Sequence, residues 1–106
     1  MDKPFRRFEI LLPLRFNDGT AVPDELLAET ALELEAQFGA VSSETQKIQG
    51  MWSHPGTQYR DDLIRIFVDV ADAPEHRAFF QQYKEKLKTR FNQLDIWMTT
   101  YLIDVI

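Results

Sequence analysis

Two stretches of the chain alternate between apolar and polar positions, as half-buried β-strands do. In residues 5–16 apolar side chains recur at every second position: Phe8, Ile10, Leu12, Leu14 and Phe16. In residues 58–70 one face carries Ile64, Ile66, Val68 and Val70, and the other carries Leu63, Arg65, Phe67 and Asp69. We predict that both stretches are strands whose more apolar face lies toward the core.

Two other stretches repeat apolar residues at helical spacing. The first is predicted to begin just after Pro23, because proline and acidic residues favour a first helical turn, and to end at Gly39. The second begins near Asp72-Ala73-Pro74-Glu75, a run that resembles a capping box, and reaches about Asn92. Its aromatic stripe is expected to pack on the sheet rather than hold a cofactor: Phe79, Phe80, Tyr83, Leu87 and Phe91.

Two weaker strands complete the pattern. Residues 44–53 are polar apart from Ile48 and Trp52, which is typical of an edge strand, and the His54-Pro55-Gly56-Thr57 run that follows favours a turn. The register of this hairpin is open, so Trp52 can face either the core or solvent. Residues 96–106 are rich in aromatic and β-branched side chains and are predicted to form the last strand.

The predicted order is therefore strand, helix, strand, strand, helix, strand. This order indicates a ferredoxin-like α+β fold, in which a four-stranded antiparallel sheet carries both helices on one face. We expect residues 1–106 to form one such domain, with the strands at 5–16 and 58–70 in the centre of the sheet. The other face of the sheet would stay open, with more apolar residues than a solvated surface needs.

Three short segments carry a resemblance to a known group of proteins. They are Leu14-Arg15-Phe16-Asn17-Asp18-Gly19, Gly50-Met51-Trp52 and Phe91-Asn92-Gln93. These segments resemble those of small bacterial proteins of unassigned activity that contain a ferredoxin-like domain. The resemblance implies this fold and brings no catalytic residue with it.

Composition and charge narrow the classes of function. A chain of 106 residues with 44% hydrophobic and 27% charged side chains is sufficient for one globular core. The net charge of −5 argues against nucleic-acid binding, and the basic positions of the second helix are interpreted as a solvated surface: Lys84, Lys86, Lys88 and Arg90. The lack of cysteine excludes disulfides and thiolate metal sites and favours the cytoplasm. Because no apolar run is long enough for a secretory signal or a membrane span, we expect a soluble protein without a membrane partner.

The densest group of potentially reactive side chains lies at the predicted hairpin. His54, Tyr59, Arg60 and Asp62 together offer an imidazole, a phenol, a guanidinium and a carboxylate, which suits acid/base chemistry or the binding of a small anionic ligand. Asp61 and Asp62 are neighbours on a strand, so they point to opposite faces and only one of them can serve a given site. The alternative is a charged hairpin tip in solvent. His54 and His76 lack metal-binding spacing, and the four glycines form no nucleotide motif, so we expect neither a metal nor a cofactor.

Two hypotheses of function remain open. The first is an interaction or ligand-binding module that self-associates as a homodimer through its open sheet face, with Leu11, Leu63 and Phe67 in the interface. The second is a small-molecule enzyme whose pocket lies near the hairpin. The sequence does not choose between them.

Overall fold

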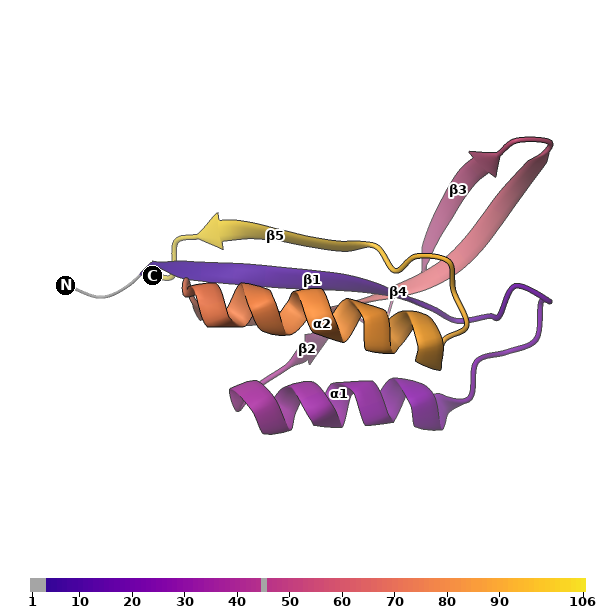
Figure 1. Cartoon of the computed structure of the whole chain (residues 1–106). Coiled ribbons are helices and arrows are strands. Elements are labelled where there is room, and N and C mark those ends of the chain that lie inside the picture. The colour runs from indigo at the N-terminus through magenta and orange to yellow at the C-terminus, as the bar shows by residue number, and fades with distance from the viewer. Residues whose placement is uncertain (1–3, 45) are drawn as a thin grey trace.

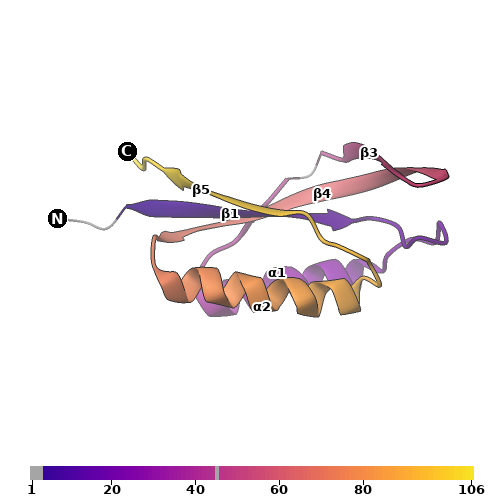
Figure 2. The ribbon, with the colours of Figure 1, turned by 45° about the horizontal axis from the view of Figure 1, so that its top comes forward.

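Two helices cover one face of an antiparallel sheet, and the other face is open (Figures 1 and 2). The computed structural model describes residues 4–44 and 46–106. The elements in chain order are β1 (Phe5–Pro13), α1 (Asp24–Phe38), β2 (Ser42–Ser43), β3 (Ile48–His54), β4 (Thr57–Ala71), α2 (Pro74–Arg90) and β5 (Met98–Ile103). This is the ferredoxin-like α+β class that the sequence predicts.

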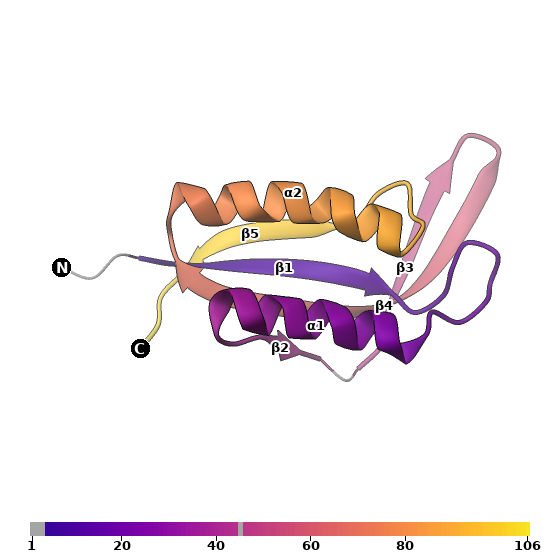
Figure 3. The same ribbon diagram turned by 60° about the horizontal axis from the view of Figure 1, so that its bottom comes forward.

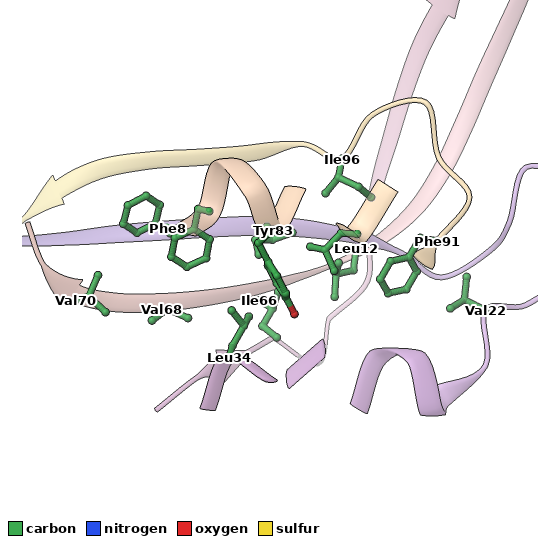
Figure 4. Close-up of a cluster of buried hydrophobic side chains, with 13 residues drawn as sticks. Phe8, Leu12, Val22, Leu34, Ile66, Val68, Val70, Tyr83, Phe91 and Ile96 are labelled. Carbon is green, nitrogen blue, oxygen red and sulfur yellow. The ribbon is translucent and has the colours of Figure 1, made fainter. Parts of the chain in front are cut away.

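The long strands β1 and β4 form the centre of the sheet, as expected. They pair antiparallel, with Ile10 opposite Ile66 and Phe8 opposite Val68. β5 pairs with the free side of β1, while β2 and β3 both pair with the side of β4 that β1 leaves open. The predicted faces are confirmed, because the side chains that the two central strands contribute to the hydrophobic core cluster are even-numbered and pack beneath the helices (Figure 4): Phe8, Ile10, Leu12, Ile66, Val68 and Val70.

In the described part of the chain the sheet has five strands rather than the expected four. The edge strand expected at residues 44–53 is divided into the two-residue β2, opposite Ile66 and Phe67, and the longer β3, opposite residues 57–63. The cause is the length of β4, whose 15 residues run past the body of the sheet and offer two separate stretches of edge. Figure 3 shows the β3–β4 hairpin extending beyond the ends of both helices.

The two helices begin and end close to where the sequence predicts. α1 ends at Gly39, whose φ of 85° permits the left-handed turn in which its N–H donates to the Glu35 carbonyl. The expected capping box at α2 is wrong. The cap is Ala73, without a side-chain hydrogen bond, because the Asp72 carboxylate instead accepts a 2.8 Å hydrogen bond from Nε of Arg6.

The core is built around aromatic rings from α2 and the sheet. Phe8 of β1 stacks on Phe80 at a centroid distance of 4.2 Å, and Phe38 of α1 stacks on the same ring at 5.3 Å. The stripe predicted for α2 is therefore core, with Phe79 at its margin. None of the helices in the described part of the chain is long and apolar enough to cross a membrane.

Candidate functional site on the open face of the sheet

We call the sheet surface opposite the helices the open face. Odd-numbered side chains of β1 and β4 form its centre, and β5 continues it on one side. Its members are Arg7, Glu9, Leu11, Leu63, Arg65, Phe67, Asp69, Trp97, Thr99 and Tyr101. Successive side chains of a strand point to opposite faces of the sheet. Because the even-numbered side chains of β1 and β4 point toward the helices, the odd-numbered ones point to the open face.

An ion pair lies at one end of the open face. Arg7 and Asp69 are directly opposite in the register, and the guanidinium donates from Nε and Nη2 to the two carboxylate oxygens at 2.7 and 2.9 Å. This hydrogen-bonded pairing raises the pKa of Arg7. The guanidinium also lies 4.3 Å from the ring centroid of Phe67, so the ring is covered by a cation rather than left bare.

Glu9 links three strands in the middle of the open face. Its Oε1 accepts a 2.6 Å hydrogen bond from the hydroxyl of Tyr101, which raises the pKa of that phenol, and its Oε2 lies 3.6 Å from Nε of Arg65. Arg65 also donates from Nη1 to Glu44 at 2.8 Å. The Nε–H of Arg65 is buried and has no hydrogen-bond acceptor among the described residues. A buried N–H in this condition can donate a hydrogen bond to a carboxylate or carbonyl oxygen from outside the chain.

Apolar side chains occupy the end of the open face nearer the hairpin. Leu11 lies opposite Arg65 and is a diagonal neighbour of both Leu63 and Phe67. Its N–H donates to the carbonyl of Trp97, the exposed residue directly before β5. All three residues expected in an interface are therefore on one face and half-buried: Leu11, Leu63 and Phe67.

The hairpin residues expected to bind a ligand are only partly described. The side chains of His54, Tyr59 and Arg60 lie outside the described part of the structure. Asp62 is largely buried, with its Oδ2 3.5 Å from Nζ of Lys47, and its buried Oδ1 has no hydrogen-bond partner in the described residues.

The other carboxylate of the hairpin has a different partner. The Oδ2 of Asp61 accepts a 2.6 Å hydrogen bond from Nε1 of Trp52. Trp52 is partly exposed and its strand register places it on the side of the open face, which resolves the alternatives that the sequence left for this residue.

Two aromatic residues of this site were not among the candidates that the sequence pattern indicates. Trp97 and Tyr101 were assigned only to a last strand, yet they belong to the open face together with Thr99. The alternation of this last strand could have indicated them. Residues 97, 99, 101 and 103 occupy every second position, and positions between them pair with the core residues Phe8 and Ile10.

A groove of about 550 Å³ also lies between the two helices, on the far side of the molecule from the open face. Its lining includes the charged residues Glu33 and Lys86, and the Glu33 carboxylate already accepts hydrogen bonds from Arg90, Lys86 and Tyr83. The expectation that Arg90 belongs to a solvated surface is wrong, because its guanidinium is largely buried and donates twice to Glu33. We assign this cluster to stability rather than ligand binding.

The sequence matches no protein-family model and no curated protein. Among solved structures, the chain is similar to a phage SAM lyase in complex with S-methyl-5'-thioadenosine, with a TM-score of 0.71 and 15% identity over 100% of this chain and 89% of that chain. It is also similar to CutA from Synechococcus elongatus, with a TM-score of 0.64 and 12% identity over 95% of this chain and 78% of that chain. At these identities the likeness shows a shared ferredoxin-like fold alone.

Proposed function

We propose that the chain is an interaction module that self-associates through its open face to form a homodimer. The main support is the gathering of apolar and aromatic side chains on that face: Leu11, Leu63, Phe67, Trp97 and Tyr101. Trp97 and Tyr101 are exposed, and tryptophan and tyrosine are enriched where proteins meet. Burial of this group would contribute a few kcal/mol at roughly 25 cal/mol per Å² before the costs of association.

The charged groups of the open face can also pair with those of a second copy of the chain. The face carries guanidinium groups and carboxylates side by side, including the pair of Arg7 with Asp69. In a two-fold dimer the same patch meets itself, so the guanidinium groups of one copy can approach the carboxylates of the other. The Nε–H of Arg65 would gain an acceptor there.

Phe67→Lys is expected to shift the protein from dimer to monomer without loss of helix content. The new ammonium would enter the interface unpaired and next to Arg7, so we expect the dissociation constant to rise about tenfold or more, which is a cost of at least ~1.4 kcal/mol. Sedimentation velocity measures the assembly and circular dichroism the helix content.

The matched control is Leu32→Lys, which adds the same charge at an exposed apolar position of α1. This variant should associate like the parent. A Phe67→Lys variant that remains fully dimeric would place the interface elsewhere.

A second candidate is a ligand-binding or enzymatic site near the β3–β4 hairpin, formed by His54, Tyr59, Arg60 and Asp62. Two observations favour it. Within the described residues, the carboxylate of Asp62 keeps one buried oxygen without a hydrogen bond, beside Lys47. One solved structure of similar fold is a SAM lyase in complex with S-methyl-5'-thioadenosine, which makes that nucleoside a probe to add to small anionic metabolites.

If this second candidate is correct, a ligand from that panel should raise the melting temperature of the parent but not of Arg60→Ala. A ligand whose free concentration is ten times its dissociation constant stabilises the folded protein by about 1.4 kcal/mol. For a chain of this size this corresponds to a rise of several degrees in melting temperature. Arg77→Ala, at an exposed position of α2, is the control and should respond like the parent. Equal shifts in all three proteins would locate binding away from the hairpin.

A further inference from the structure

The sheet has two long edges that no strand of the described residues covers. Within residues 4–44 and 46–106, β3 pairs only with β4 and β5 only with β1, so their outer sides lie on opposite edges of the sheet. The strands have seven and six residues. Neither contains Lys, Arg, Asp, Glu or Pro, the residues with which proteins usually keep an exposed edge from pairing. Both edges are therefore chemically able to receive another strand.

The β3–β4 hairpin lies outside the cover of the two helices (Figures 1 and 3). It extends beyond the helical layer (Figures 1 and 3), and the molecule measures 51 × 29 × 25 Å. Two-stranded hairpins without cover on either face are only marginally stable in water. Contact with another surface would stabilise the hairpin by burying apolar side chains and by satisfying the outer backbone groups of β3.

On each side of the sheet, β3 and β5 expose apolar side chains of the same kind. On the helix side of the sheet, Met51 of β3 is 70% exposed and Leu102 of β5 is 56% exposed. On the side of the open face, Trp52 is 41% and Tyr101 is 44% exposed. When two strands pair, residues of the same side become neighbours, so each aromatic would meet an aromatic and each aliphatic an aliphatic.

We propose that the outer edge of β3 in one copy pairs with the outer edge of β5 in a second copy, so that the sheet continues from one chain to the next. This inference rests on the proposed self-association and names the strands that join. A two-fold dimer with two reciprocal pairs satisfies both edges of both copies and turns the open faces toward each other. Lysine, arginine, aspartate and glutamate are missing from both strands, so no like charges from these residues oppose one another.

Because the chain contains no cysteine, introduced thiols can test this pairing. Met51→Cys and Leu102→Cys are made separately, one with a purification tag, and the two chains are co-expressed. Air oxidation, or a short thiol-reactive cross-linker that tolerates a small shift of register, should give the mixed cross-linked pair as the main product. Each variant alone should give little cross-link. The control pair is Leu32→Cys with Leu102→Cys, which should not cross-link because Leu32 lies on α1.

Cross-linking of the Leu102→Cys chain to itself would overturn the inference in favour of β5–β5 pairing. So would the lack of a mixed product with either reagent while the same proteins still sediment as dimers. That result would leave the proposed self-association intact, whereas sedimentation of the parent as a monomer would remove both.

Discussion

Replacement of Ile66 by Asp is expected to abolish cooperative unfolding. Ile66 is 2% exposed, lies in the centre of β4 opposite Ile10, and packs in the same core cluster as Leu34. A carboxylate at this position would be buried without a partner, which costs several kcal/mol against a total stability of about 5–15 kcal/mol. Urea or thermal unfolding followed by circular dichroism should therefore show no transition.

Phe67→Lys is the internal comparison for this effect, because residue 67 is the next residue of β4 and lies on the open face. That variant should still unfold cooperatively. A variant Ile66→Asp that unfolds with the same midpoint as the parent would contradict the assigned faces of β4, and with them the location of the open face.

Removal of the Glu33 carboxylate is expected to cause the second largest loss of stability. Glu33 joins the two helices, because it accepts hydrogen bonds from Arg90 at 2.7 and 3.0 Å and from the hydroxyl of Tyr83 at 2.9 Å. The Arg90 side chain is 9% exposed, so Glu33→Ala would leave a guanidinium without its main partner. Because Glu33 itself is 29% exposed, we discount the usual cost of breaking a buried pair to about 2–3 kcal/mol.

Glu29→Ala is the matched control, since Glu29 lies 3.6 Å from the same guanidinium but is 54% exposed. Exposed ion pairs contribute little, so this change should cost less than about 1 kcal/mol. Chemical denaturation of the parent and both variants measures the difference. Equal losses for the two variants would contradict the role given to Glu33.

The contribution of Glu33 to the stability of the fold should depend on pH in the acid range. The hydrogen bonds from Arg90 lower the pKa of Glu33 from 4.5 to about 2. A carboxyl whose pKa is lower in the folded state stabilises the fold above the pKa of the unfolded chain and loses that contribution on protonation. The stability difference between the parent and Glu33→Ala should therefore be complete above about pH 4.5 and shrink as the pH falls toward 2. A difference that stays constant over this range would show that charge plays no part.

The parts of the fold that follow a local pattern could be predicted from the sequence. The alternation of apolar and polar residues in β4 predicts its buried face, and Gly39 predicts the end of α1. Both signals depend only on residues close together in the chain. The division of the edge into β2 and β3 was missed, since it depends on how far β4 extends past the sheet.

The side-chain contacts were harder to predict, because most join residues far apart in the sequence. Arg90 binds Glu33 across 57 positions, and Tyr101 binds Glu9 across 92. Neither partner can be recognised before the helices and strands are placed. The capping role expected of Asp72 failed for the same reason, because Arg6 competes for its carboxylate.

Self-association through the open face is the central claim, and the mass of the parent protein in solution tests it most directly. Sedimentation equilibrium over concentrations from low micromolar to millimolar should give twice the chain mass of 12.4 kDa, with dissociation only at the lowest concentrations. A mass of 12.4 kDa over the whole range would contradict the claim.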